Sequence, residues 1–148
     1  MSTQVRLTAD GRARLNERMA ELADELLPAM RPLLVEDERD ERVVADFERL
    51  QAEHDRLYVL LGTAGDIDPG SLGEQISLGS RVVISDPEGQ RRIVRIVDPV
   101  EAFLDDERIS CTSPLAVALL GHGVGDECQV RAPSGIWVAT VIAVGEDD

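Results

Sequence analysis

The sequence predicts an α+β protein: an N-terminal antiparallel helical hairpin followed by a small antiparallel sheet domain with one helix. Three observations predict it. Apolar residues recur at steps of three and four up to residue 61, the apolar period changes to two beyond residue 79, and a glycine-rich stretch separates the two patterns. We place the hairpin at residues 1–64, a linker at 65–78 and the sheet domain at 79–148.

The first arm of the hairpin carries apolar residues three or four positions apart, which keeps them on one helix face. The members of this seam are Leu15, Met19, Leu22, Leu26, Met30 and Leu33. Thr8 follows the hydrophobic Leu7 and offers a capping hydroxyl at the start of the helix. Pro28 and Pro32 each lack an N–H, and their rings crowd the previous turn, so we expect a kink or a break there.

The second arm has a more regular seam that alternates steps of four and three, as in a two-helix coiled coil. Its members are Val43, Phe47, Leu50, His54, Leu57 and Leu61. Gly62, directly after the last of them, is a typical C-terminal stop. Each arm therefore needs the other to cover its apolar face.

An acidic stretch joins the arms and forms the tip of the hairpin. Its carboxylates are Glu36, Asp37, Glu38, Asp40 and Glu41. They repel one another unless water or cations surround them. On the residues alone, a solvated turn is the preferred interpretation, because charge runs at helix ends usually are solvated.

The second part reads as short strands and one helix. Residues 81–85 and 90–97 flank the turn Asp86-Pro87-Glu88-Gly89, and 127–131 and 136–144 flank Pro133-Ser134-Gly135. A third strand is expected at 108–111. Ser113 and Pro114 offer an N-cap and a preorganised first position for a helix that ends at Gly121.

Composition excludes several classes of function. The 148 residues carry a net charge of −14, with all 15 basic residues Arg, so we expect no direct nucleic-acid binding. No run reaches the roughly 18–20 apolar residues that cross a bilayer. We therefore expect no membrane association and a cytoplasmic location.

Candidate catalytic chemistry is sparse. Cys111 and Cys128 lie in strand patterns and read as buried free thiols, while His54 on the seam and His122 between glycines suit packing or loop roles. Trp137 reads as a core residue, with an exposed anchor as the other interpretation. No phosphate loop or nucleophile elbow is present, so we expect no catalytic residue, no cofactor and no enzyme activity.

One element resembles a known family. The segment from Ile109 to Gly121 matches, residue for residue, the pattern I-S-x-x-S-P-x-A-x-x-L-x-G of bacterial Gre factors. The Ala132-Pro133-Ser134-Gly135 turn is similar to the family's Pro-Gly-Gly turn, and the order of hairpin, acidic tip, linker and sheet domain is also theirs. The resemblance covers nearly the whole chain.

This resemblance implies an FKBP-like second domain that docks on the rim of the RNA polymerase secondary channel, with the hairpin entering the channel. It places the contact at Thr112, Ser113 and Pro114. The partner would be RNA polymerase, bound by a monomer. In the cleavage factors of the family, two tip carboxylates help hold a second magnesium ion. Glu36, Asp37 and Glu38 are the candidates to share that magnesium here, with no metal site of the protein's own.

The tip departs from that family pattern. Its Gly-Asp-Leu-x-Glu-Asn motif is absent, and the hairpin is shorter by roughly nine residues, which split over two arms gives about 7 Å less reach. A shorter hairpin is also found in the Rnk-like members of the superfamily, which bind polymerase without promoting cleavage.

Three functions follow, in order of preference. The first is a Gre-like regulator that modulates, and by preference inhibits, transcription without efficient transcript cleavage. The alternative is an elongation factor that rescues stalled polymerase by stimulating cleavage. The second alternative, an FKBP-like isomerase or chaperone, rests on the fold alone.

Overall fold

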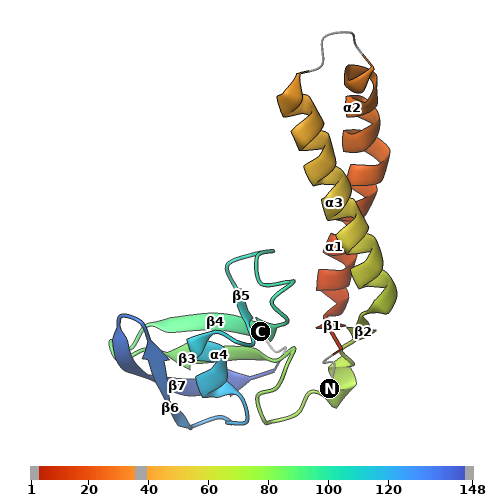
Figure 1. The fold of residues 1–148 in the computed structure, drawn as a ribbon. Helices are drawn as coiled ribbons and strands as arrows, with labels where there is room; N and C mark the ends of the chain where they lie inside the picture. Colours follow the sequence, from red (N-terminus) through yellow and green to blue (C-terminus); the bar gives the residue numbers. More distant parts are fainter. Residues whose placement is uncertain (1–3, 36–39, 146–148) are drawn as a thin grey trace. The chain divides into compact units, whose positions relative to one another are not determined.

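The computed structural model describes residues 4–35 and 40–145. They form two compact units. The first contains Ala9–Gly65 with the residues up to Val5, and the second contains Arg6–Thr8 with the chain from Asp66 onward. The predicted order of helical hairpin and sheet domain is confirmed (Figure 1).

The first unit is the helical hairpin. One arm runs through α1 (Ala9–Glu21), a π-helical turn (Leu22–Leu26) and α2 (Leu27–Leu34), and the other arm is α3 (Glu41–Thr63). The arms lie side by side and antiparallel, as Figure 1 shows. The chain stays helical through both Pro28 and Pro32, so of the expected kink or break the break does not occur.

The irregularity lies one turn earlier, at the π turn. Its wider hydrogen bond runs from the Leu27 N–H to the Leu22 carbonyl, five residues back. A π turn holds one more residue than an α turn, so the buried side of the arm moves forward by one position. Leu22 is 0% exposed and Leu27 is 3% exposed, whereas the predicted seam residue Leu26 is half-buried and Leu33 is 45% exposed.

The second arm follows its predicted seam. Leu57 is buried and the other seam residues, from Val43 to Leu61, are half-buried. The helix runs one residue beyond Gly62. Arg12 of α1 donates to the carbonyls of Leu61 (3.0 Å) and Ala64 (2.9 Å), which supplies partners at the C-terminal end of α3, where helix carbonyls lack them.

One bidentate ion pair joins the two arms. The Arg18 guanidinium donates to both carboxylate oxygens of Glu53, at 2.7 and 3.0 Å. This hydrogen bonding lowers the pKa of Glu53 below its ordinary value. Arg18 also contacts Glu21, three residues further along the same helix, at 2.9 Å, so the link between the arms is the pair with Glu53.

The second unit contains a five-stranded sheet in the order β5-β4-β3-β7-β6. Its strands are β3 (Arg81–Ser85), β4 (Arg91–Val97), β5 (Arg108–Ser110), β6 (Glu127–Ala132) and β7 (Gly135–Val144). Both predicted hairpins form, but β5 pairs parallel to β4, so the sheet is mostly rather than wholly antiparallel. The parallel pair is possible because residues 98–107 carry the chain back along β4 as far as Arg95, opposite which β5 begins.

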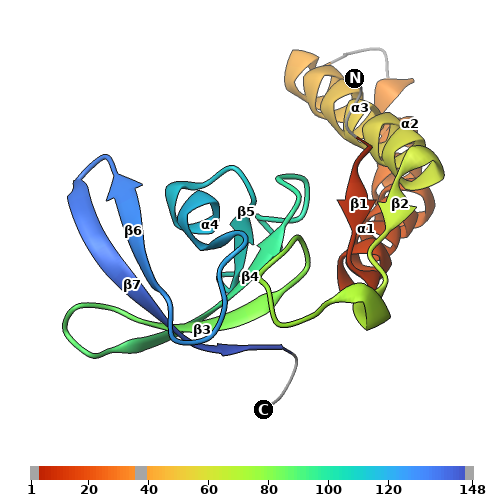
Figure 2. The same cartoon turned by 90° about the horizontal axis from the view of Figure 1, so that it is seen from below.

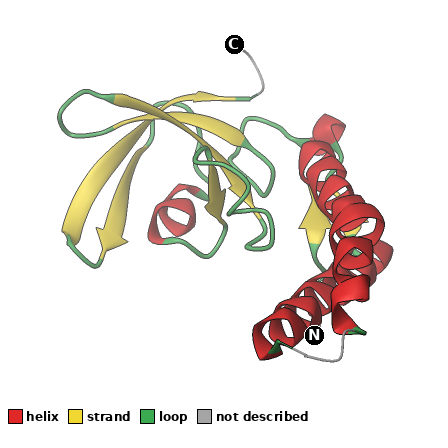
Figure 3. Ribbon diagram, turned by 90° about the horizontal axis from the view of Figure 1, so that it is seen from above, coloured by secondary structure: helices red, strands yellow, loops and turns green. Residues whose placement is uncertain are grey.

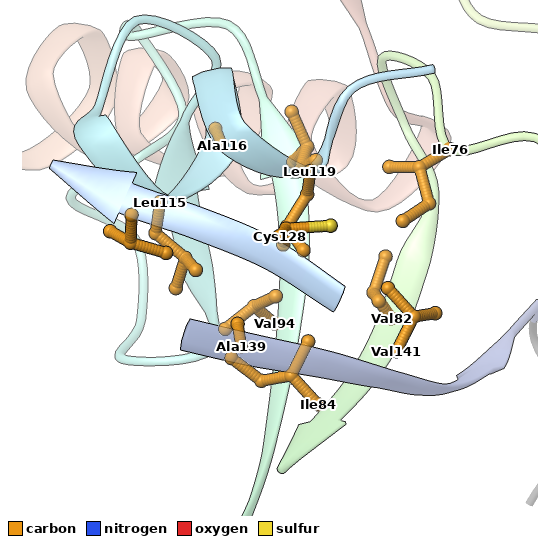
Figure 4. Packing of buried hydrophobic residues seen from close by; sticks show 12 residues of the cluster. Ile76, Val82, Ile84, Val94, Leu115, Ala116, Leu119, Cys128, Ala139 and Val141 are labelled. Atoms are coloured by element: carbon orange, nitrogen blue, oxygen red, sulfur yellow. The ribbon is translucent and has the colours of Figure 1, made fainter. Parts of the chain in front are cut away.

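The helix α4 (Pro114–Leu119) lies on one face of this curved sheet, as Figure 2 shows. Figure 3 shows the same helix beside the strands of this unit. Leu115, Ala116 and Leu119 pack on the sheet, with aliphatic partners such as Val94 and Ile84 (Figure 4). Cys128 is buried there as predicted, whereas Cys111 is only half-buried.

The chain between the units is not a bare connector. Within the expected linker, β2 (Gly65–Asp66) pairs with β1 (Arg6–Leu7), and a 3-10 turn spans Pro69–Ser71. Ile67 and Ile76 are buried in the second unit. In the part of the chain that the structure describes, no helix is long and apolar enough to cross a membrane.

Candidate functional site

The turn from Ser110 to Pro114 connects β5 to α4; we call it the docking turn. Ser110 accepts the Thr112 N–H (3.1 Å) through its side chain and the Ser113 N–H (2.9 Å) through its carbonyl. The hydroxyls of Ser110 and Thr112 lie 2.8 Å apart. The Cys111 N–H donates to the Val97 carbonyl at 2.8 Å, which ties the turn to the end of β4.

Ser113 is the N-cap of α4, as the sequence predicts. Its side-chain oxygen accepts the Ala116 N–H at 3.3 Å, and Pro114 occupies the first turn, where a missing N–H costs nothing. Thr112 and Pro114 are exposed, while Ser113 is half-buried. The three predicted docking residues therefore share one short, hydrogen-bonded turn.

The exposed side of α4 continues this surface with apolar side chains. Val117 is 62% exposed and Leu120 is 36% exposed, and they follow Pro114 at helical steps of three. The opposite side of the helix holds the buried Leu115 and Leu119, which fix its orientation. The docking turn thus exposes the hydroxyl oxygens of Ser110 and Thr112, and the adjacent side of α4 exposes a row of apolar side chains.

A buried polar cluster lies in the connection that leads into β5. Glu101 is 0% exposed and accepts two hydrogen bonds from Thr8, from the N–H at 2.8 Å and from the hydroxyl at 2.6 Å. The Arg108 guanidinium lies 3.5 Å from the Glu101 carboxylate and also pairs with Asp105. A buried carboxylate is stable only when such partners surround it.

Sequence reasoning missed this cluster. Acids and arginines are rarely buried, and the three partners come from positions 8, 101 and 108, which no local pattern connects. The cluster helps to position the docking turn, because Arg108 is the first residue of β5 and Ser110, the last residue of β5, begins the turn. It also explains why Thr8, at the start of α1, belongs with the second unit.

The hairpin tip is described only on its α3 side. Asp40 is the N-cap of α3, where its side chain accepts the Arg42 N–H at 2.9 Å, and Glu41 is the first helical residue. Both are exposed, and their negative charges interact favourably with the positive end of the helix dipole. Glu36, Asp37 and Glu38 lie outside the described residues, so the predicted magnesium-sharing positions stay a prediction.

The remaining candidates have local partners. His122 contacts Asp126 at 3.2 Å, and His54 stacks on Tyr58 with ring centroids 6.4 Å apart. Burial raises the pKa of the Cys128 thiol. Trp137 is half-buried and packs against the core, which confirms the preferred interpretation. Among the described side chains, no three His, Cys, Asp or Glu residues group to hold a metal ion.

Comparison with known proteins decides the family. A family model described as the C-terminal part of the transcription elongation factors GreA and GreB matches residues 71–146, which include the docking turn. The chain belongs to the GreA/GreB family. This family membership confirms the resemblance on which the docking residues were chosen, and it makes the protein a transcription factor.

Relatives of two kinds match nearly the whole chain. The transcription inhibitor protein Gfh1 of Thermus thermophilus is 36% identical, over 97% of this chain and 99% of the relative. The transcription elongation factor GreA of a Thermotoga species is 31% identical, over 95% and 97%. The crystal structure of Thermus thermophilus Gfh1 covers 97% of this chain and 100% of its own at 35% identity, with a TM-score of 0.44. The family assignment therefore rests on the sequence matches.

Proposed function

We propose that this GreA/GreB-family protein binds RNA polymerase at the rim of the secondary channel and inhibits RNA synthesis without efficient transcript cleavage. The observation that carries the proposal is the docking turn: the family's I-S-x-x-S-P element forms an exposed turn whose shape is fixed by hydrogen bonds. The protein acts as a binding protein, not as an enzyme. Its site of action is the cytoplasm, as a monomer on the polymerase.

The geometry supports docking through Thr112, Ser113 and Pro114. A turn that is already ordered loses little conformational entropy on binding, so its contacts contribute more of their energy to affinity. The apolar stripe of Val117 and Leu120 adds burial next to the polar turn. The net charge of −14 argues against phosphate backbones as the primary partner.

The tip supports inhibition rather than cleavage. Asp40 and Glu41 sit at the start of α3, where they can approach cations or crowd the route of nucleotides. The cleavage factors' tip motif is absent from residues 36–41. An inhibitor is among the relatives, at 36% identity over nearly the full length.

Transcript cleavage is the second candidate, because a relative named as an elongation factor also matches almost the whole chain. In that case Glu36, Asp37 and Glu38 share the polymerase magnesium and activate water.

The isomerase or chaperone alternative gains no support from the structure. Phe103 of the second unit is 73% exposed, so its ring does not line a pocket.

The docking step is tested with Pro114→Arg in a polymerase pull-down with purified proteins. We expect roughly tenfold weaker retention, since a buried contact is replaced by an unpaired charge. Pro133→Arg, which changes another exposed turn proline, is the matched control and should bind normally. Wild-type affinity of the Pro114 variant, with unchanged melting curves for both, would move the docking surface elsewhere.

The tip step is tested by transcription from stalled and initiating complexes at equal polymerase occupancy. Replacement of Glu36, Asp37, Glu38, Asp40 and Glu41 by Ala should abolish inhibition and leave binding intact. The control replaces exposed carboxylates along the arms, namely Glu17, Asp24, Glu25 and Glu48. Equal inhibition by wild type and tip variant would show steric blockage alone. Shortened transcripts with the wild type only would establish the cleavage alternative.

A further inference from the structure

The face of the sheet that points away from α4 has an unusual composition. Strand residues alternate between the two faces, and the core face is marked by buried residues such as Val82, Ile84, Val94 and Ile96. Apart from Val97 at the end of β4, which is buried, the alternate positions of β3, β4, β6 and β7 therefore form a second surface, which we call the outer sheet face. In Figures 2 and 3, α4 lies on the core face and no other described helix of this unit lies on the outer one.

Charge is segregated on the outer sheet face. From residue 66 onward the chain has 6 arginines and 15 acids. Four of those arginines but only one of the acids occupy outer-face positions of these four strands. The charged residues concerned are Arg81, Arg91, Arg95, Arg131 and Glu127. This face is therefore basic on a strongly acidic protein.

Aliphatic side chains lie between the arginines. Ile93 is 39% exposed and pairs with Val83 at the centre of β3 and β4. Within β4, Arg91 lies two residues from Ile93 on one side and Arg95 two residues on the other. A spacing of two strand residues is roughly 7 Å, within reach of one bound element.

The same pairing of charge and apolar surface recurs on the other two strands. Ile136 is 63% exposed and Val138 is 40% exposed, and Ile136 lies opposite Arg131 in the register of β6 and β7. Arg131 is itself exposed. Clustered exposed aliphatic residues with cationic neighbours are typical of interaction surfaces rather than of ordinary solvated sheet.

We propose that the outer sheet face binds an acidic amphipathic helix of a partner protein, separately from the docking turn. Carboxylates on such a helix pair with Arg91 and Arg131, while its aliphatic residues cover Ile93, Ile136 and Val138. A nucleic acid fits less well: the face has no aromatic side chain for bases to stack on, its aliphatic residues cannot pair with phosphates, and the net charge of −14 repels a polyanion.

The test uses the full chain and a fluorescent 21-residue peptide of Glu and Leu with the leucines on one helix face. Anisotropy should rise with the protein, and Arg91→Glu with Arg131→Glu should weaken binding about tenfold or more. Arg92→Glu is the matched control, because Arg92 is also exposed but pairs with the core-side Ile84 and so projects from the other face. It should change affinity less than about twofold. A peptide with Gln in place of Glu should bind weakly.

A second measurement keeps the proposal independent of variant folding. Backbone NMR shifts of the wild type should move at Ile93, Arg131 and Val138 when peptide is added, and Pro114→Arg should not alter peptide affinity. Three results would overturn the proposal: shifts confined to α4 and the docking turn, tighter binding of a 20-base-pair duplex than of the peptide, or self-association that the double charge reversal abolishes.

Discussion

The two units bury their apolar residues very differently. The sheet unit has a cluster of twelve buried residues from four strands, α4 and the segment before β3, whereas the described part of the hairpin buries only Leu15, Leu22, Leu27 and Leu57 among its apolar residues. Most hairpin seam positions stay half-buried, because two helices alone leave the edges of their seam open to water. This difference in burial predicts a more stable sheet unit and a less stable hairpin, since stability is not uniform across a structure.

Two spectroscopic signals let the unfolding of each unit be followed separately. Trp137, the only tryptophan, lies in the sheet unit, and far-UV circular dichroism is dominated by the hairpin helices. Tryptophan fluorescence and dichroism during urea unfolding therefore give one curve for each unit.

The largest effect is expected for Leu119→Ala in the sheet unit. Leu119 is 0% exposed and surrounded by strands that cannot close around the cavity, so we expect a loss of about 3–5 kcal/mol in the free energy of unfolding. The fluorescence transition should move to lower urea. A shift below about 1 kcal/mol would mean that this core is loosely packed.

Leu22→Ala makes the same change in the hairpin at equal burial, since Leu22 is also 0% exposed. Most seam residues of the hairpin are half-buried and can relax, so we expect about 2–3 kcal/mol, at the lower end for this substitution. The dichroism curve should shift and the fluorescence curve should not. Coincident shifts of both curves would show that the two units unfold as one.

Acid pH should weaken the hairpin through Glu53. The pKa of Glu53 is lowered in the folded state, so its pairing with Arg18 stabilises the hairpin above the unfolded-state pKa and is lost as pH falls through the folded-state pKa. Because the pair is partly exposed, we expect at most about 1 kcal/mol. Dichroism melts of Glu53→Gln should lose this part of the pH dependence, while Glu48→Gln should keep it.

The smallest effect is expected for deletion of the exposed Ala23 in the π turn. Removing one residue converts the turn into a regular α-helix and leaves Leu22 and Leu27 on the same face, so the stability should change by less than about 1 kcal/mol. Deletion of the exposed Ala52 in α3 is the control, since it rotates Leu57 by about 100° off the seam. If both deletions unfold the hairpin equally, the π turn is required for its packing.

Local patterns predicted much of this fold. The four–three seam located α3, the period-two stretches located both hairpins of the sheet, and Ser113 with Pro114 marked the start of α4. Each of these elements is determined by residues close together in the sequence, so the spacing of residue types is enough to predict it. The docking turn followed from the same cap and the family pattern.

Two kinds of feature were not predicted. The π turn is local, but the spacing of apolar residues does not show it, and it shifted the buried position from Leu26 to Leu27. The parallel pairing of β5 and the burial of Glu101 depend on segments far apart in the chain. Both features hold β5, which leads into the docking turn. The residues of the turn were therefore predictable, whereas the contacts that hold it in place were not.

The place of Thr8 in the second unit has a consequence for how this protein can vary. Residues 6–8 and the chain from Asp66 belong together, and Ile67 donates its N–H to the Leu7 carbonyl at 2.8 Å. The hairpin is therefore inserted into the second unit, entering and leaving through adjacent strands. Equal numbers of residues can be added to or removed from both arms without changing these strands. The arms can thus be lengthened or shortened, in evolution or by engineering, without any change to the residues of the docking turn.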